Sequence, residues 1–446
     1  MNRAIDIAAA VRTGQVRASD IVERHLAALA ADDNRLVAVT RVLAERARAE
    51  AQQIDATIAA GGDPGPLAGV PYGVKDLFDV TGLPTTAGSS LYADAPPATV
   101  DATAIARLRA AGAVLVATLN MDEFAYGFAT INAAHGTTRN PHDLDRLAGG
   151  SSGGSAAIVA AGLLPFSLGS DTNGSIRVPA SLTGLYGLKP THGGLPMAGV
   201  FPFAASFDDI GPFTSSLADL AVLWDVLSES VAEPIETPLR VARLGGRFAE
   251  NLDPDQRNAI DAIAPDAPTI SLGDVARARA AAFLITAFEG GAVHRAAFAQ
   301  GQALQFDPAT RDRLLAGALL PDAVYAEAQA FRATFTRALE PIFAQYDVLI
   351  APSAPCFAPT IADPQVLIDG VATPARRDLG IHTQPISFTG CPALAVPLLR
   401  PGRLPLGVQL IGAPGGERTL FRFAAMLEER GLTGISPPAG AFQGED

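Results

Sequence analysis

The chain has 446 residues, of which 48% are hydrophobic and 18% charged. A chain this apolar can fill a large core, which excludes an intrinsically disordered protein. Its formal net charge of −13 disfavours binding to a phosphate backbone, so we expect no nucleic-acid partner. No apolar run reaches the roughly 18 residues of a membrane-spanning helix. Asp6 and Arg12 flank the first apolar stretch, unlike the pattern of a signal peptide.

Cysteine and lysine are both rare in this chain. Cys356 and Cys391 are too few for a disulfide framework, which indicates a reducing cytoplasm. Both lie among proline and apolar residues, which favours buried packing over a nucleophilic role. Lys75 and Lys189 are the only lysines among 33 basic residues. A desolvated lysine can lose its proton and an arginine cannot, so each lysine is a candidate for a role that needs an amine.

Helices are predicted over the first 60 residues. One begins at an N-cap in Ala18–Asp20, and a long Arg- and Ala-rich helix is predicted over Val39–Ala60. Strands and helices then alternate, with strands at Leu67–Val74, Ala113–Thr118 and Leu163–Leu168 and a helix at Asp101–Ala111. This order predicts an α/β fold in which a parallel or mixed sheet lies between helices.

Residues 236–345 differ in character from the segments on either side. Apart from a predicted strand at Leu239–Leu244, they are Ala-rich and are predicted to form a helical insertion or lid. The strand pattern resumes at Asp347–Ala351. It continues at Ala393–Leu398 and Leu406–Ile411, which an RPGRLP loop joins as a hairpin.

Two Gly- and Ser-rich segments are the densest candidates for chemistry. Leu147–Ser155 contains G-x-S-x-G twice, with Ser151 or Ser152 at the centre, but it lacks the preceding strand of a nucleophile elbow. It also lacks the phosphate-loop and dinucleotide patterns. Asp171–Ser175 follows a predicted strand and opens a helix. Amides at a helix start can hold an anion beside a serine, and the alternative is a turn that only caps the helix.

A serine nucleophile needs a base. None of the six histidines has metal-ligand spacing, so no metal site is expected, while a Ser–His pair stays open because such partners can lie far apart in sequence. Lys75 ends a buried strand and is a better base than Lys189, which is predicted to lie in a loop. Sites form beyond the carboxyl ends of strands, so Lys75, Asn120 and Asp171–Ser175 are expected to converge.

Three separated segments in this order resemble the amidase signature family: PYGVKDLFDV around Lys75, the stretch GGSSGGS to GLKPTHG, and QPISFTGCPALAVP. The similarity covers Leu67–Gly211 and Gln384–Gly412. It implies the amidase signature fold, in which helices flank both faces of a large mixed sheet, as one domain over residues 1–446. The parts are N-terminal helices 1–60, a signature core 61–235, a variable substrate-side insertion 236–345 and a return to the sheet over 346–446. It also implies an amide-bond hydrolase without a cofactor or metal.

The resemblance also implies roles for single residues. Ser175 matches the family's nucleophile, Ser151 its cis-serine and Lys75 its base. The amides of the oxyanion hole match Thr172, Asn173, Gly174 and Ser175, and the residues that brace the site match Asp171, Arg177 and Ser152. We expect a structural role for Lys189, which lies in the same core.

The segments MDEFAYGFATINAAHG, TRNPHD and HTQPISFTG are similar to family members that cleave small urea-like or carboxylated amides. These members are related to A-type amidotransferase subunits, which leaves an A-type subunit or a general aliphatic or aryl amidase as alternatives. The run Phe128–Asn132 replaces the Ser/Thr/Glu-rich run of the A-type subunits, which argues against glutamine as the substrate. The similarity implies a small C-type accessory subunit in a heterotetramer, or otherwise a homodimer.

The substrate pocket is expected to be lined by four residues that follow the strand ending near Asn120, namely Tyr126, Phe128, Thr130 and Asn132. A substrate carboxylate would be met bidentately by an arginine. The sequence offers several candidates and does not choose among them: Arg295, Arg311, Arg313, Arg376 and Arg377.

Overall fold

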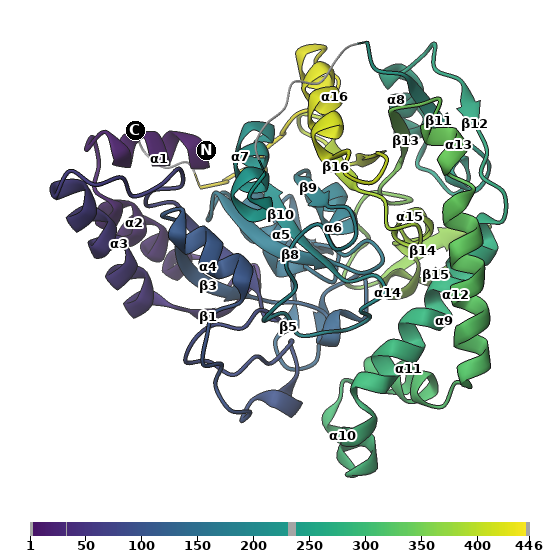
Figure 1. The fold of residues 1–446 in the computed structure, drawn as a ribbon, viewed down its shortest axis with the longest axis horizontal. Coiled ribbons are helices and arrows are strands. Elements are labelled where there is room, and N and C mark those ends of the chain that lie inside the picture. The colour runs from purple at the N-terminus through teal and green to yellow at the C-terminus, as the bar shows by residue number, and fades with distance from the viewer. Residues whose placement is uncertain (1–2, 33, 231–237, 443–446) are drawn as a thin grey trace.

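The computed structural model describes residues 3–32, 34–230 and 238–442 (Figure 1). Its centre is a mixed sheet of 11 strands, which confirms the predicted α/β class. In sheet order the strands are β1 (Val39–Val42), β3 (Val114–Leu119), β2 (Pro71–Lys75), β8 (Phe166–Asp171), β10 (Asp209–Thr214), β9 (Tyr186–Lys189), β16 (Ala393–Pro397), β17 (Gly407–Ile411), β13 (Val348–Pro352), β11 (Val241–Leu244) and β12 (Thr269–Ile270). Two-stranded ribbons pair β4 (Ile131–Asn132) with β5 (Gly136–Thr137), β6 (Arg139–Asn140) with β7 (Asp143–Leu147), and β14 (Gln365–Ile368) with β15 (Val371–Pro374).

The N-terminal part differs from its prediction in one element. The helices here are α1 (Ala4–Arg12), α2 (Ala18–Ala31) and α3 (Ala44–Ala59). The predicted helix over Val39–Ala60 is therefore wrong at its start, because Val39–Val42 forms β1 and pairs antiparallel with β3. The sequence of β1 is VTRV, and three of its four residues are β-branched, a side-chain type that favours a strand.

The strands that carry the site lie in the middle of the sheet. β2 pairs in parallel with both β3 and β8, and β8 pairs antiparallel with β10. Lys75 is the last residue of β2, as predicted. The predicted strand at Leu163–Leu168 lies further along the chain, at Phe166–Asp171, so Ser170 and Asp171 belong to the strand itself. The carboxyl ends of β2 and β8 therefore meet at one edge of the sheet.

Two short helices bring the Gly- and Ser-rich segments to that edge. All residues of α5 (Gly153–Ala160) and α6 (Arg177–Thr183) are buried. At Gly154 a Cβ would come within 2.5 Å of Asn120 N, so only glycine lets α5 approach the end of β3 this closely. Further helices pack on the sheet: α4 (Thr103–Ala110), α7 (Leu217–Ser228) and α16 (Glu417–Glu429). The short helix α14 (Ala375–Asp378) packs on the β14–β15 ribbon, and α15 (Gln384–Ser387) packs on α9 (Val275–Val293).

The insertion lies on the side of the molecule away from α1–α3 (Figure 1). Its helices are α8 (Pro254–Ile263), α9 (Val275–Val293), α10 (Arg295–Ala299), α11 (Pro308–Ala318), α12 (Asp322–Arg337) and α13 (Glu340–Phe343). The helix α9 packs on both α11 and α12. The insertion is not only helical, because β11 and β12 extend the central sheet beyond β13. Residues 236 and 237, at the predicted start of this insertion, lie outside the described part of the chain.

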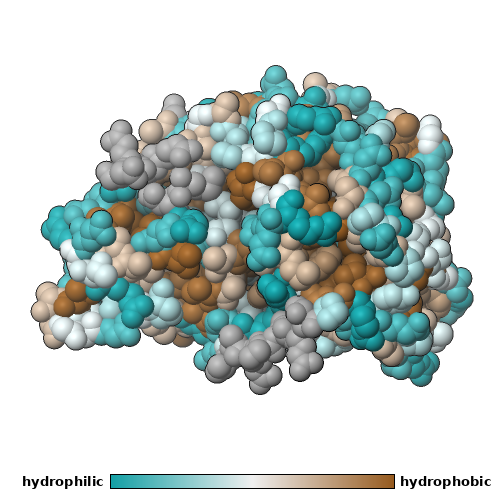
Figure 2. Space-filling view, turned by 90° about the horizontal axis from the view of Figure 1, so that it is seen from above, coloured by the Kyte–Doolittle hydropathy of each residue, from teal (hydrophilic) through white to brown (hydrophobic). Residues whose placement is uncertain are grey.

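The view from above shows polar side chains around the margin and apolar side chains recessed between them (Figure 2). In the described part of the chain, no helix combines the length and the apolar character that crossing a membrane requires.

Candidate active site

Lys75 lies at the centre of a buried cluster of hydroxyl groups. Its Nζ donates to Ser151 Oγ at 2.7 Å and to Ser170 Oγ at 2.8 Å. Ser151 comes from the loop before α5, and Ser170 comes from β8, the strand beside β2. The peptide bond between Gly150 and Ser151 is cis, as the resemblance implies. Ser151 is the partner that the resemblance implies for Lys75, whereas Ser170 was not among the predicted site residues.

The surroundings of Lys75 favour its neutral amine. The side chain is fully buried, and this burial lowers the pKa of Lys75 from 10.5 to about 7, although the nearby carboxyl groups of Asp122, Asp171 and Asp208 oppose the shift. A lysine with such a pKa is largely able to accept a proton at neutral pH. The arrangement therefore supplies a base next to a serine hydroxyl.

The loop after β8 carries Ser175 and a set of free backbone donors. The Gly174 amide already donates to Asp171 Oδ1 at 2.6 Å. The structure therefore does not support the prediction that Gly174 contributes to an oxyanion hole. Within the described residues, the amides of Thr172, Asn173 and Ser175 donate to no protein acceptor. These three remain the amides of this loop that can face an anionic oxygen.

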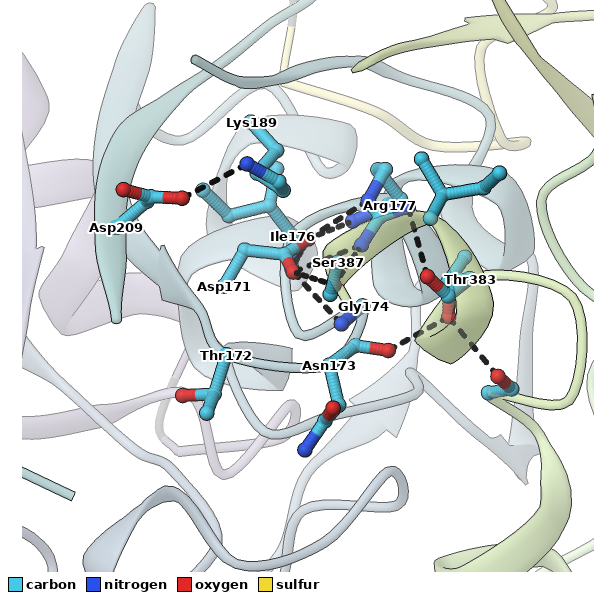
Figure 3. Close-up of polar contacts among 12 residues, drawn as sticks. Asp171, Thr172, Asn173, Gly174, Ile176, Arg177, Lys189, Asp209, Thr383 and Ser387 are labelled. Atoms are coloured by element: carbon cyan, nitrogen blue, oxygen red, sulfur yellow. Dashed lines mark hydrogen bonds and ion pairs between the residues drawn. The ribbon is translucent and has the colours of Figure 1, made fainter. Parts of the chain in front are cut away.

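A buried ion pair holds this loop in shape (Figure 3). The Arg177 guanidinium donates to Asp171 Oδ1 and Oδ2, both at 3.0 Å, and neither side chain is exposed. Arg177 also donates to Ser387 Oγ at 2.6 Å and Gln409 Oε1 at 2.8 Å, which ties the loop to α15 and β17. Burial alone would raise the pKa of Asp171, but Arg177 and the surrounding donors hold it below its usual value. The pair therefore fixes the backbone on which Ser175 lies.

Ser152 has a similar bracing position. Its Oγ donates to Ser170 O at 3.0 Å, and its backbone amide donates to Ser175 O at 3.3 Å. Ser152 thus links the loop before α5 to both β8 and the Ser175 loop, and it keeps their backbones in register.

Lys189 lies at the end of β9 and not in a loop, which corrects its predicted position. It is buried, and its Nζ donates to Asp209 Oδ2 at 2.7 Å (Figure 3). His192 Nδ1 lies 3.1 Å from the other oxygen of Asp209. Asp209 is directly opposite Asp171 in the β8–β10 pairing. Lys189 therefore has the structural partner that its predicted role requires.

A small pocket opens beside Ser175. The space between its atoms, including open solvent at its mouth, is about 260 Å³. Its lining consists of Ala125, Tyr126, Gly127, Phe128, Thr172, Asn173, Ser175, Phe203, Phe283, Arg313 and Gln384. The loop after β8 supplies one wall, and Phe283 of α9 and Arg313 of α11 belong to the insertion.

Two of the predicted pocket residues have other contacts. Thr130 Oγ1 donates to Ser151 O at 3.3 Å and accepts from the Gly153 amide at 3.0 Å, so Thr130 braces the loop before α5. The Asn132 side chain donates to the carbonyl oxygens of Gly88 and Met121. The prediction that Thr130 and Asn132 line the pocket is therefore wrong, because both side chains are already used to hold backbone segments.

The structure separates the five candidate arginines. Arg376 forms ion pairs with Asp122 and Asp307, while Arg311 and Arg377 each pair with the aspartate that follows in the chain. Arg295 is exposed on α10. Only Arg313 among the five lines the pocket beside Ser175.

Several site groups were missed by the sequence analysis. Asp208 accepts from Thr172 Oγ1 at 2.7 Å, and burial raises the pKa of this carboxyl to about 6. Asp122 accepts from the Thr130 amide at 2.8 Å. Asp122 follows the apolar strand β3, and Asp208 directly precedes the apolar strand β10. This position next to the end of a strand is the signal that could have identified them.

The remaining candidates of the sequence have no catalytic surroundings. Burial raises the pKa of the Cys356 thiol to about 12 and also raises that of Cys391, which disfavours the reactive thiolate. Asn120 donates to Val37 O and Gly136 O and fixes loops behind the site. Across the described residues, His, Cys, Asp and Glu side chains form no group that could hold a metal ion.

The chain is similar to known proteins over nearly its whole length. A family model described as Amidase matches residues 20–421. The chain belongs to the amidase family. It is 43% identical over 458 residues to the AtzE subunit of the 1-carboxybiuret hydrolase of Pseudomonas sp. (strain ADP), covering 96% of this chain and 99% of that protein. It is 37% identical over 463 residues to the A-type subunit of the glutamyl-tRNA(Gln) amidotransferase of Chloroflexus aurantiacus, covering 93% of each.

Comparison with solved structures leads to the same family. A solved structure of an s-triazine catabolic enzyme, described as a vestigial protein complex, matches with a TM-score of 0.92 and 43% identity over 98% of this chain and 100% of that chain. The expected amidase fold and the class of amide hydrolases are thereby confirmed for this member of the amidase family.

Proposed function

We propose that this amidase-family chain hydrolyses a small urea-like or carboxylated amide through Lys75, Ser151 and Ser175. The observation that carries the proposal is the buried amine of Lys75, 2.7 Å from Ser151 Oγ and with a pKa lowered to about 7. Ser175 lines the adjacent pocket next to unused backbone amides. A base, a hydroxyl relay, a nucleophile and oxyanion donors are the parts that acyl transfer needs.

In the first half of the reaction, neutral Lys75 accepts the Ser151 proton while Ser151 takes the proton of Ser175. Ser175 Oγ forms a bond to the carbonyl carbon, and the carbonyl oxygen becomes an anion that faces the loop amides. The proton returns from Lys75 through Ser151 to the leaving nitrogen as the carbon–nitrogen bond breaks. An amine leaves, and the acyl group remains as an ester on Ser175.

In the second half, water replaces the amine. Lys75 again accepts a proton through Ser151, now from the water that attacks the ester carbon. The ester bond breaks, the proton goes to Ser175 Oγ, and the carboxylic acid leaves. The same relay therefore serves both halves, and the chain needs no cofactor or metal for either step.

The substrate class follows from the pocket and from the relatives. The space beside Ser175 suits a small molecule, and the similar AtzE protein is named for the hydrolysis of 1-carboxybiuret. We therefore propose a 1-carboxybiuret-like substrate. The alternative, an A-type amidotransferase subunit, is favoured by the 37% identity to such a protein. A hydrolysis screen that includes 1-carboxybiuret, biuret, allophanate, simple aliphatic and aryl amides and glutamine separates the two.

A small accessory subunit is part of the proposal. The similar solved structure is described as a vestigial protein complex, and the relatives include one component of an amidotransferase. We expect a small C-type protein to co-purify with the chain from its native host in a heterotetramer. Recovery of a fully active homodimer alone would contradict this partner.

The test of the mechanism compares two buried serines six residues apart. Replacing Ser175 by alanine is expected to lower kcat by about 10⁴-fold or more, because the attacking oxygen is lost. Ser181→Ala is the matched control, since Ser181 is buried in α6 and its hydroxyl has no partner among the described residues. Turnover and covalent labelling with a fluorophosphonate are measured for both. Full turnover by Ser175→Ala would overturn the mechanism.

A further inference from the structure

A second cavity lies at the end of the central sheet that is farther from the insertion, where β1, β3 and β2 are neighbours (Figure 1). Thr40 and Arg41 of β1, Thr118 of β3 and Asp76 after β2 contribute to its lining. The space between its atoms, including open solvent at its mouth, is about 390 Å³. No residue that lines it also lines the pocket beside Ser175. The two cavities are therefore separate, and the proposed reaction does not use this one.

The interior of this cavity contains a carboxylate that no protein cation neutralises. Asp76 directly follows Lys75, its Oδ1 accepts from Thr40 Oγ1 at 3.2 Å, and its Oδ2 accepts from Thr86 Oγ1. The Gly88 amide also donates to this carboxylate, yet burial raises the pKa of Asp76. Within the described residues no basic side chain lies within ion-pair distance of it.

Three neutral donors do not saturate this carboxylate. An ionised carboxylate offers about four acceptor positions, so at least one position on Asp76 stays free. A buried charge without a counter-charge is unfavourable, because it has lost its water and gained no opposite charge. A cation that enters the cavity would therefore be bound at Asp76.

Two basic side chains line the same cavity. Arg41 is exposed, and its guanidinium forms no ion pair and no hydrogen bond with the described residues. His135 is half-buried and acts on Asp76 only through space. Since Arg41 is exposed and Asp76 is largely buried, the positive group lies toward the mouth and the negative group toward the interior. A ligand with an inner cation and an outer anion matches this arrangement.

The remaining lining is mostly apolar. Phe78 and Val80 are each 2% exposed, and Leu83 and Pro84 are half-buried beside them. An aliphatic group gains by leaving water for such a surface, whereas an additional charged group would lose its water without finding a partner. An inorganic cation or a simple amine would use Asp76 alone and leave both Arg41 and this apolar surface without a contact.

We propose that this cavity is a binding site for a small aliphatic α-amino acid. The ammonium group of the ligand binds the Asp76 carboxylate, and its carboxylate binds the Arg41 guanidinium, which presents paired donors. The aliphatic side chain packs on Phe78 and its apolar neighbours. The binding needs neither Ser175 nor turnover, so it is independent of the proposed function.

The first test makes the same charge change in the two cavities. Arg41→Met removes the cation of the proposed site, and Arg313→Met removes a cation that lines the pocket beside Ser175. Titration calorimetry with L-valine is expected to show one saturable site in the wild type. Its Kd is expected to rise about tenfold or more in Arg41→Met and to stay unchanged in Arg313→Met. The opposite order would place valine in the pocket beside Ser175 and overturn the inference.

The second test removes the inner carboxylate. Asp76→Asn keeps the shape of the side chain, and its Kd for valine is expected to be about 10- to 100-fold higher than that of the wild type. Asp219→Asn is the matched control, because Asp219 is also buried without an ion pair among the described residues and accepts from the amides of Ala4 and Ile5. An unchanged Kd in Asp76→Asn that circular dichroism shows to be folded would contradict the site.

The third test uses the wild type alone, so its result does not depend on the folding of a variant. Isobutylamine lacks the carboxylate of valine, and isovalerate lacks its ammonium group. Each is expected to bind about tenfold or more weakly than valine, because one of the two ion pairs is lost. Equal binding of isobutylamine and valine would overturn the role of Arg41 and with it the class of ligand. Absence of saturable valine binding to the wild type would overturn the inference as a whole.

Discussion

The two walls of the pocket beside Ser175 satisfy their polar groups in different ways. In the signature core, Arg177 pairs with Asp171 and Lys189 pairs with Asp209, and all four side chains are almost completely buried. On the insertion side, Arg313 has no ion pair within the described residues. These two buried cations of the core thus have internal carboxylate partners, whereas Arg313 of the insertion faces the pocket without one among the described residues.

This difference assigns two tasks to two parts of the molecule: the paired groups of the core serve the reaction itself, and the unpaired groups of the insertion select the substrate. Internal ion pairs hold the backbone of the Ser175 loop in one geometry, which acyl transfer requires whichever amide is bound. Unpaired groups on the insertion can only be satisfied by a ligand, so they discriminate between ligands. Changes in the core are therefore expected to lower kcat or stability for every substrate, and changes in the insertion to alter the order of preference among substrates.

In the comparison of the two walls, the largest effect is expected at Lys75 of the core. Lys75→Arg keeps a positive charge but cannot accept a proton, so we expect kcat to fall by about 10³-fold or more on every amide that the wild type cleaves. Lys189→Arg is the matched variant, because Lys189 is equally buried but acts as a cation toward Asp209. It is expected to retain most of its turnover. Steady-state kinetics of the two variants check this, and near-normal rates in Lys75→Arg would remove Lys75 from the mechanism.

The second effect concerns the stability of the core wall. Arg177→Met leaves the fully buried carboxylate of Asp171 without its cation, and we expect the free energy of unfolding to fall by about 3–5 kcal/mol. Arg240→Met is the comparison, because its pair with Asp347 is 54% and 28% exposed and surface pairs contribute little. Urea unfolding followed by circular dichroism measures both. An equal, small change in the two variants would mean that the Asp171 pair does not stabilise the loop.

The core wall is also the part of the site that the sequence predicted best. Ser151 and Asp171–Ser175 stand in Gly- and Ser-rich segments and Lys75 stands in the segment PYGVKDLFDV, so their identity could be taken from motifs. Ser170 lies one residue before Asp171 and was missed, because its contact with Lys75 depends on β8 extending to Asp171 and lying beside β2. A one-dimensional pattern does not contain that register.

The insertion wall was predicted least well, for a physical reason. Five arginines looked equivalent in sequence, and only the packing of α9 against α11 places Arg313 in the pocket. In the core, Thr130 and Asn132 were misplaced in the same way, because their side chains bond to backbone in neighbouring loops. The error at Val39–Val42 has another cause, because its β-branched residues already favour a strand and the predicted helix was extended over them from the segment that follows.

The last prediction uses the pH profile to compare the two sides of the pocket. Two buried groups have a pKa of about 7, Lys75 in the core and Glu123, which accepts from Ser89 Oγ and from the Asp307 amide of the insertion. Below pH 7 the neutral fraction of Lys75 falls about tenfold per pH unit, so we expect kcat/KM to fall with the same slope. Above pH 7 it is expected to reach a plateau.

The variant Glu123→Gln shows whether Lys75 or Glu123 causes the fall in kcat/KM below pH 7, called the acidic limb, because glutamine keeps an acceptor oxygen but does not titrate. If Lys75 is the base, the limb stays near pH 7 in Glu123→Gln, and only stability changes. Burial raises the folded-state pKa of Glu123 from 4.5 to about 7, so its contribution to stability is fully present below pH 4.5 and is lost as the pH rises through 7. Glu123→Gln should therefore gain stability relative to the wild type as the pH rises through this window. If the acidic limb is lost in Glu123→Gln, a group in contact with the insertion controls the reaction. The insertion would then affect the reaction itself and not only the choice of substrate.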